Sequence, residues 1–342
     1  METSIAVLGT GAIGSSIGAD LTRAGHDVLL IDQWPAHVDA MKTAGLRVIL
    51  PEKELLTPVR AIHLCELCTV RPQLDMVFLA PKSYDSCWMV ELIKPYLKPD
   101  GMVISAQNSL NEEWVAPLIG AERVIGCTLE LSGELFEPGR VKRNTNHATT
   151  KFVLGELDGR ITPRLQEIAQ ILSSVGKTGV TTNIWGAKWT KLVAVSMVFG
   201  LDVILWLRPW QILEALECLP LSLKLAKEAV QVASASGRVL DPVFGLNSED
   251  FLKSTDEAFK KLQTNIHRDI GKEARTVMMQ DIEKGRPTEI DYLGGLVVKK
   301  GREVKVATPL NEVVTSLVKQ IEQGILKPGL SNLKMLEGYG KC

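Results

Sequence analysis

The stretch Gly9-Thr10-Gly11-Ala12-Ile13-Gly14 follows the apolar run Ile5–Leu8 and opens a segment whose apolar residues recur at helical spacing. A second apolar run, Val28–Ile31, ends at Asp32, twenty-three residues after Gly9. Strand, glycine triplet, helix, strand and terminal acid follow one another in the order that a dinucleotide-binding βαβ unit requires. A glycine triplet alone is a weak signal, but in this context it predicts that the chain binds a dinucleotide.

Each glycine of the triplet has a distinct physical use in such a unit. Gly9 permits a tight turn, Gly11 lets the backbone approach a pyrophosphate, and Gly14 lets the helix pack closely on the strand. The phosphates would meet the positive N-terminus of the helix, and Asp32 would accept hydrogen bonds from the adenosine ribose. The alternative is a glycine-rich turn without a ligand. The residues expected to contact the cofactor here are Gly9, Gly11, Ala12, Ile13, Gly14 and Asp32.

The composition is that of an ordinary globular protein, with 45% hydrophobic and 23% charged residues in a chain of 342. This length favours two domains. A net charge of −1 argues against the basic face that nucleic-acid phosphates need, so we expect a small-molecule substrate and no nucleic-acid partner. The first strand begins within four residues of the N-terminus, which leaves no room for a signal peptide and predicts a cytoplasmic protein.

Six cysteines are scattered along the chain, which argues against a disulfide framework. Cys65 and Cys68 form a CxxC pair near His63, but no second pair stands at zinc spacing. The surrounding segment, Ala61–Leu67, has the pattern of a strand. We therefore expect no metal.

The apolar segment Ile184–Leu207 could be mistaken for a membrane span. It contains Lys188, Lys191 and Asp202, and the run between them, Leu192–Leu201, has ten residues. A span needs about twenty. A buried helix is the better interpretation, and no membrane partner is expected.

Short β-branched runs alternate with helical segments up to about residue 182, which predicts a doubly wound, mainly parallel α/β sheet over residues 1–182. The strand-like runs are Ile5–Leu8, Val28–Ile31, Met76–Leu79, Met102–Ser105, Val124–Cys127, Phe152–Gly155 and Gly179–Thr182. Helical spacing lies between them, for example at Ile13–Ala24, Ser83–Ile93 and Pro163–Ser174.

Strand signals vanish after residue 183, so residues 183–342 are predicted to form an all-helical domain. Long helices are expected at Leu219–Ser234, Ser248–Gln263 and Pro309–Gln323. Pro309 suits the first turn of its helix, and Thr308 is the expected N-cap. A sheet domain followed by a helical one usually places the reactive site in the cleft between them.

Four polar residues lie at positions where they could contact a ligand or transfer a proton. Lys82 and Asn108 follow strands, at the sheet edge where open α/β folds bind ligands. Lys191 lies inside a very apolar helix, and Glu289 follows Pro287 at a helix start. Each residue also has a purely structural alternative. Lys82 could be a solvated lysine and Asn108 a turn residue. Lys191 could extend its ammonium to solvent, and Glu289 could interact only with the helix dipole.

Taken together, these motifs resemble ketopantoate reductase (2-dehydropantoate 2-reductase) and its relatives over nearly the whole chain. The resemblance rests on the glycine motif, Lys82, Gln107-Asn108, Trp189-Thr190-Lys191-Leu192 and Arg286-Pro287-Thr288-Glu289-Ile290-Asp291. It implies an N-terminal Rossmann domain that binds the nicotinamide cofactor and a helical domain of the 6-phosphogluconate-dehydrogenase type. It also implies that Lys191 is catalytic, accompanied by Lys82, Asn108 and Glu289 around substrate and nicotinamide.

The chemistry of a reductase agrees with those roles. Hydride delivery to a carbonyl builds negative charge on its oxygen, and a nearby ammonium stabilises that charge and can supply the proton. Lys191 can act as this general acid/base, and Glu289 can orient it or hold a substrate hydroxyl.

The substrate pocket departs from the family pattern. Ketopantoate reductases typically carry asparagines four and eight residues after the catalytic lysine, and a serine before the Met-x-Gln-Asp element. Here these positions are Val195, Phe199 and Val277, and Ser196 is one residue out of register. Substrate oxygens left unpaired in a cleft cost about 1–3 kcal/mol each. We therefore predict a small, more apolar 2-keto or 2-hydroxy acid or ketone as the substrate.

The cofactor end departs as well. Relatives that use NADP commonly place an arginine after the second strand to pair the 2′-phosphate, whereas this chain has Asp32-Gln33-Trp34-Pro35. An acid binds two ribose hydroxyls and repels a phosphate, so NAD(H) is predicted, with NADP(H) as the alternative.

Two other functions stay open at this point. One is an ordinary 2-dehydropantoate 2-reductase of pantothenate synthesis with an unusual pocket. The other is a non-catalytic dinucleotide-binding regulator, although such a protein has no need of a proton donor such as Lys191. The tryptophans of the helical half could form either a homodimer interface or a core. They are Trp185, Trp189, Trp206 and Trp210.

Overall fold

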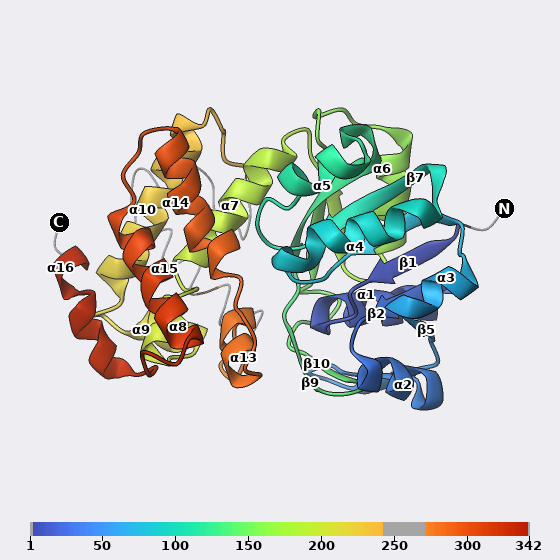
Figure 1. The fold of residues 1–342 in the computed structure, drawn as a ribbon, viewed down its shortest axis with the longest axis horizontal. Helices are drawn as coiled ribbons and strands as arrows, with labels where there is room; N and C mark the ends of the chain where they lie inside the picture. Colours follow the sequence, from blue (N-terminus) through green and yellow to red (C-terminus); the bar gives the residue numbers. More distant parts are fainter. Residues whose placement is uncertain (1–2, 242–263, 265–270, 341–342) are drawn as a thin grey trace. The chain divides into compact units, whose positions relative to one another are not determined.

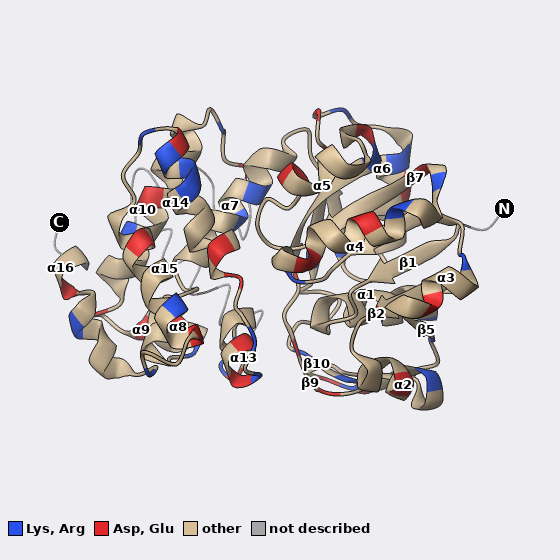
Figure 2. Ribbon diagram, viewed as in Figure 1, with Lys and Arg blue, Asp and Glu red and all other residues tan. Residues whose placement is uncertain are grey.

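The computed structural model describes residues 3–241, 264 and 271–340. The chain divides into two compact units, Met1–Ile184 and Trp185–Cys342. Figure 1 shows strands and helices in the first unit and helices in the second. Charged residues of both signs are dispersed along the ribbon of both units (Figure 2). The expected helix Ser248–Gln263 lies outside the described residues.

The first unit is built on an eight-stranded sheet in the order β12-β11-β8-β7-β6-β1-β2-β5. Its strands pair in parallel except where β11 runs antiparallel to β8. Each of the expected strand runs overlaps a strand of this sheet, so the prediction of a mainly parallel sheet is confirmed. The strands are β1 (Ile5–Leu8), β2 (Val28–Asp32), β5 (Arg60–His63), β6 (Leu74–Leu79), β7 (Leu97–Ala106), β8 (Val124–Glu130), β11 (Lys151–Glu156) and β12 (Lys177–Val180).

Helices and hydrophobic clusters cover both faces of this sheet. Ile5 and Val7 of β1 belong to one cluster, and Ala6 and Leu8 belong to the other. Successive side chains of a strand point to opposite faces, which explains why a parallel sheet needs nearly continuous apolar runs. The helices of the unit are α1 (Ala12–Arg23), α2 (Pro35–Ala44), α3 (Leu67–Val70), α4 (Ser86–Ile93), α5 (Glu112–Ile119) and α6 (Pro163–Leu172).

The sequence did not predict a second, four-stranded sheet in this unit, in the order β4-β3-β10-β9. Its strands are four or five residues long and carry many charged residues, so they leave little period-two signal. They are β3 (Leu46–Ile49), β4 (Glu54–Thr57), β9 (Gly133–Glu137) and β10 (Arg140–Arg143).

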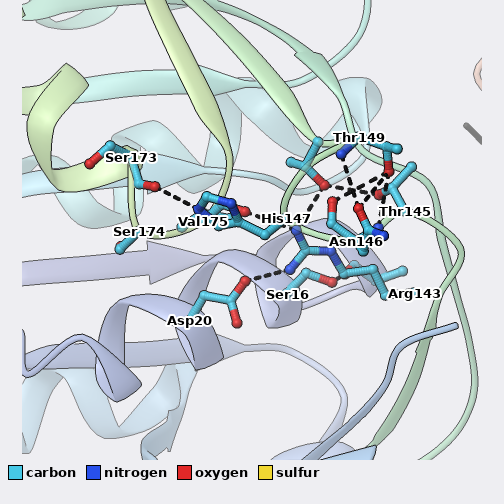
Figure 3. A network of polar contacts seen from close by, with 12 residues as sticks. Ser16, Asp20, Arg143, Thr145, Asn146, His147, Thr149, Ser173, Ser174 and Val175 are labelled. Carbon is cyan, nitrogen blue, oxygen red and sulfur yellow. Dashed lines mark hydrogen bonds and ion pairs between the residues drawn. The ribbon is translucent and has the colours of Figure 1, made fainter. Parts of the chain in front are cut away.

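A buried arginine fixes this small sheet to the rest of the unit (Figure 3). Arg143, at the end of β10, forms an ion pair with Asp20 of α1. It also donates hydrogen bonds to Thr150 Oγ1 at 2.8 Å and to the Val175 carbonyl at 2.9 Å. One guanidinium thus joins β10, α1 and the connection from α6 to β12.

The CxxC segment is not the expected strand Ala61–Leu67. β5 ends at His63, whose backbone N–H donates to Glu66 Oε2 at 2.7 Å, and a 3₁₀ turn follows. This capping box ends the strand early. Cys65 and Cys68 are exposed free thiols, and the described residues contain no cluster of three metal-ligating side chains.

The second unit is helical throughout its described part. Its elements are α7 (Ile184–Ser196), α8 (Leu201–Leu205), α9 (Pro209–Glu214), α10 (Leu219–Ala235), α13 (Val277–Glu283), the 3₁₀ turn η5 (Ile290–Tyr292), α14 (Gly294–Glu303), α15 (Pro309–Glu322), the 3₁₀ turn η6 (Leu330–Met335) and α16 (Glu337–Gly340). None of the helices in the described residues is both long and apolar enough to cross a bilayer. The apolar segment Ile184–Leu207 instead forms α7 and α8, which are separated by a turn at Gly200 with φ +99°.

The cap of α15 differs from the sequence prediction. Thr308 occupies the N-cap position, but its side chain makes no capping hydrogen bond. Glu228 of α10 supplies the acceptor instead, because its carboxylate accepts the N–H groups of Leu310 and Asn311 at 3.0 Å each. A buried carboxylate at a helix N-terminus also complements the helix dipole.

Candidate active site

The glycine-rich loop has the geometry of a phosphate cradle. Gly9 has φ +87°, and a Cβ there would lie 2.6 Å from the Pro81 nitrogen. A Cβ on Gly14 would overlap the Gly9 carbonyl oxygen, so helix α1 can begin here only with glycine at that position. A Cβ on Gly11 would meet no atom within 4 Å, which leaves open space beside the loop backbone. These features fit a bound pyrophosphate.

Asp32 ends β2 beside this loop and is 8% exposed. Its Oδ2 accepts the Thr10 N–H at 2.5 Å and the Thr10 hydroxyl at 3.0 Å. Its Oδ1 accepts the Trp34 N–H at 2.8 Å. The carboxylate therefore fixes the loop as well as standing at the position expected for the ribose contact, and the sequence predicted only the second of these roles.

Lys82 and Asn108 follow neighbouring strands, as predicted. Lys82 precedes a 3₁₀ turn (Ser83–Asp85) after β6, and Asn108 comes two residues after the end of β7. Both side chains are half-buried. Because β7 pairs with β6 and β6 with β1, these residues and the glycine loop follow three adjacent strand ends.

Polar bonds that the sequence did not predict hold these two segments together. Gln107 Nε2 donates to the Pro81 carbonyl and to Ser86 Oγ, at 2.8 Å each. Asn111 Nδ2 donates to Ser83 Oγ at 3.1 Å and to the Asn108 carbonyl at 2.7 Å. The segments that carry Lys82 and Asn108 are thus cross-linked to each other.

In the second unit, Lys191 is half-buried on α7, and Val195 is buried one helical turn later. Phe199 lies beyond the end of the helix, in a turn where its N–H donates to the Val195 carbonyl at 2.8 Å. The Ser196 hydroxyl donates to the Leu192 carbonyl of its own helix at 2.7 Å. The Ser196 hydroxyl proton is therefore engaged by the helix backbone.

Val277 is the first residue of α13 and is half-buried. The preceding residue, Thr276, caps this helix and donates its hydroxyl proton to Asp202 of α8. Asp202 is fully buried and also accepts the N–H groups of Gly200 and Val203 at 2.8 Å each. Burial raises the pKa of Asp202 to about 6, against the opposing effect of these three hydrogen bonds. This acid joins the turn after Phe199 to the start of α13, a role that no local sequence pattern indicated.

Glu289 is 6% exposed and precedes η5 in a turn that is anchored on both sides. On one side Arg286 Nε donates to the buried Asp281 at 2.7 Å. On the other, the Thr288 N–H and hydroxyl donate to Glu322 of α15 at 2.7 and 2.5 Å. No local pattern could have identified Glu322, because it lies 34 residues away from Thr288.

Comparison with known proteins finds one family over most of the chain. The description "Ketopantoate reductase PanE/ApbA" matches residues 5–159, and "Ketopantoate reductase PanE/ApbA C terminal" matches residues 183–322. The 2-dehydropantoate 2-reductase of Archaeoglobus fulgidus is 26% identical over 94% of this chain and 98% of its own. That of Pyrococcus horikoshii is 29% identical over 93% of this chain and 97% of its own.

Solved structures of the same family have a similar fold. A PanE/ApbA family ketopantoate reductase from Ralstonia eutropha has a TM-score of 0.79 at 25% identity, covering 94% of this chain and 99% of its own. A ternary structure of D-mandelate dehydrogenase with NADH and anilino(oxo)acetate has a TM-score of 0.82 at 25% identity, with the same coverage of both chains.

Proposed function

The chain belongs to the ketopantoate reductase PanE/ApbA family, as its resemblance predicted, and we propose that it reduces a small, relatively apolar 2-keto acid or ketone, or oxidises the corresponding alcohol. It is an oxidoreductase that acts on CH–OH groups with a nicotinamide dinucleotide. In this proposal residues 1–182 bind the dinucleotide and residues 183–342 supply the proton donor and the substrate contacts.

The proposed mechanism assigns one task to each polar group. The nicotinamide supplies or accepts the hydride when it is bound. The Lys191 ammonium stabilises the negative charge that develops on the substrate oxygen and donates the proton to it, and Glu289 orients that ammonium or holds a substrate hydroxyl. Lys82 and Asn108 would hold the substrate and the nicotinamide from the strand ends.

The observation that carries the substrate proposal is the apolar character of three positions in the second unit. Val195, Phe199 and Val277 stand where the family typically has two asparagines and a serine. Two neighbouring hydroxyls are already bonded within the protein: Ser196 donates to its own helix and Thr276 donates to Asp202. These positions offer no hydrogen bond to a substrate oxygen, and they favour an apolar substituent instead.

The similarity to D-mandelate dehydrogenase supports the same conclusion. Mandelate is a 2-hydroxy acid with a phenyl substituent, so an enzyme with this fold acts on an apolar member of the substrate class. We infer that this chain takes a substrate of similar kind, with its substituent against the valine and phenylalanine side chains.

Initial rates with a panel of 2-keto acids and ketones test this proposal. We expect phenyl- or branched-alkyl-substituted 2-keto acids to give a higher kcat/KM than ketopantoate. The triple variant Val195→Asn, Phe199→Asn, Val277→Ser should raise kcat/KM for ketopantoate by about tenfold for each hydrogen bond restored. Ser196→Ala, which removes a hydroxyl bonded to its own helix, is the matched control and should leave that value unchanged.

The second candidate function is 2-dehydropantoate reduction itself, which the names of the curated relatives favour. Ketopantoate turnover as fast as that of the best substrate in the panel would support it. The same result would refute the apolar-substrate proposal.

We propose NADH as the preferred cofactor because Asp32 would repel a 2′-phosphate. The measurement is the ratio of kcat/KM for NADH to that for NADPH, in the wild type and in Asp32→Ala. Loss of the bonds to Thr10 should weaken the use of both cofactors, whereas loss of the charge changes only their ratio. A ratio above one in the wild type that falls in the variant supports the proposal, and an unchanged ratio contradicts it.

A further inference from the structure

His37 is a completely buried histidine of α2 that the proposed chemistry does not use. Its Nδ1 accepts the backbone N–H of Gly139, in the turn between β9 and β10, at 2.8 Å. Its Nε2 lies 3.2 Å from the hydroxyl oxygen of Ser15 on α1. The indole of Trp34 stacks on the imidazole, with ring centroids 5.6 Å apart and an interplanar angle of 24°.

These partners fix the protonation state of the ring. A backbone N–H can only donate, so Nδ1 must be unprotonated and the neutral ring must carry its proton on Nε2. That proton points to the Ser15 oxygen, and the Ser15 hydroxyl in turn donates to the Thr10 carbonyl at 2.7 Å. Burial lowers the pKa of His37, against the opposing effects of Asp32 and the Thr10 backbone, which agrees with a neutral ring.

The hydrogen bonds therefore run in one direction, from the Gly139 amide through His37 and Ser15 to the Thr10 carbonyl. Thr10 lies between Gly9 and Gly11 in the glycine-rich loop, and Asp32 holds its N–H and hydroxyl from the other side. All three polar groups of this residue are thus occupied within the protein. The loop backbone is held in the conformation that leaves the space beside Gly11 open.

We propose that His37 is a positioning residue for the dinucleotide: through Ser15 it holds Thr10, and hence the glycine-rich loop, ready for the pyrophosphate. The proposal rests on the proposed function in that it assumes the loop binds an adenine dinucleotide. It assigns the small sheet a purpose as well, because the turn between β9 and β10 supplies the donor at the start of the chain of bonds.

Two substitutions separate the two halves of this arrangement. In His37→Gln the side-chain amide reaches the position of Nε2 and can still donate to Ser15. In His37→Asn the amide oxygen takes the position of Nδ1 and can still accept from Gly139, but the bond to Ser15 is lost. Ser15→Ala removes the next link, and it replaces serine with a better helix former.

The test is NADH binding, followed by nucleotide fluorescence in the absence of substrate, together with urea unfolding of each variant. We expect Kd to rise about tenfold in His37→Asn and in Ser15→Ala, the effect of losing one buried hydrogen bond. The double variant His37→Asn, Ser15→Ala should show the same Kd as either single variant. The Kd of His37→Gln should stay within about twofold of the wild-type Kd, even if this variant has a lower free energy of unfolding than His37→Asn.

His147→Asn is the matched control, since this exposed histidine lies in the same unit and its Nε2 bonds to the Ser173 carbonyl rather than to any residue of the relay. Its Kd should equal that of the wild type. Wild-type NADH affinity in His37→Asn and Ser15→Ala would refute the positioning role and leave the proposed function intact. The same holds if the loss of affinity in His37→Asn and His37→Gln is proportional to the loss of unfolding free energy. A wild-type protein that binds neither NADH nor NADPH would refute the proposed function itself.

Discussion

Replacing Asp202 with asparagine should remove a pH-dependent penalty on the stability of the second unit. Asp202 is fully buried, and its pKa is raised from 3.8 to about 6 because burial disfavours the charged carboxylate. Asparagine has nearly the same shape. Its carbonyl oxygen can accept the N–H groups of Gly200 and Val203, and its amide can donate to Thr276 Oγ1.

The sign and size of the effect follow from linkage. The folded-state pKa lies above the unfolded one, so the folded protein holds the Asp202 proton more tightly and loses stability as the pH rises from about 4 to about 6. A full difference between 3.8 and about 6 corresponds to about 3 kcal/mol at about 1.36 kcal/mol per pKa unit. The penalty is about 1 kcal/mol at about pH 4.5 and about 3 kcal/mol at about pH 7.5, so about 2 kcal/mol should develop between them.

Urea unfolding of the wild type and Asp202→Asn at a series of pH values measures this directly. The stability of the variant relative to the wild type should increase by about 2 kcal/mol between about pH 4.5 and 7.5. Any change in hydrogen bonding with Thr276 changes the unfolding free energy of the variant by the same amount at every pH, so the increase between the two pH values is unaffected. Asp291→Asn, which removes an exposed carboxylate paired with Lys319, controls for the loss of one charge. A flat difference between wild type and Asp202→Asn would refute the reasoning.

Three further outcomes are expected. Gly14→Ala should abolish NADH binding and destabilise the first unit, because its Cβ would overlap a backbone oxygen of the loop; isothermal titration and urea unfolding would check both effects. Asp20→Asn should lower the free energy of unfolding in urea by about 3–5 kcal/mol, because it leaves the Arg143 guanidinium, which is 1% exposed, without its counter-ion. Arg143→Met should lower it by less, because the carboxylate that it leaves unpaired, on Asp20, is 16% exposed. The reverse order would contradict this. Glu322→Gln should lower kcat with little change in NADH affinity, because it loosens the turn that carries Glu289; an unchanged kcat would show that the anchor does not serve catalysis.

The sequence identified what is encoded in short stretches of chain. The glycine triplet, the first two apolar strands and the acid that ends β2 lie within the first 32 residues, and their order follows from the geometry of one βαβ unit. Lys82 and Asn108 could be placed because each follows a strand of a parallel sheet. The small second sheet escaped prediction because its strands are short, charged and paired across the unit.

Local order along the chain therefore indicated the two-part architecture and the glycine-rich loop as a candidate dinucleotide site, and the family resemblance added the candidate residues for proton transfer. Only the tertiary structure decided which distant groups hold those residues in place. His37 meets Gly139 across 102 positions, Asp202 meets Thr276 across 74, and Arg143 meets Asp20 across 123. Such contacts leave no periodicity or spacing in the sequence, because each forms only when separately encoded elements pack together and bury their polar groups against one another.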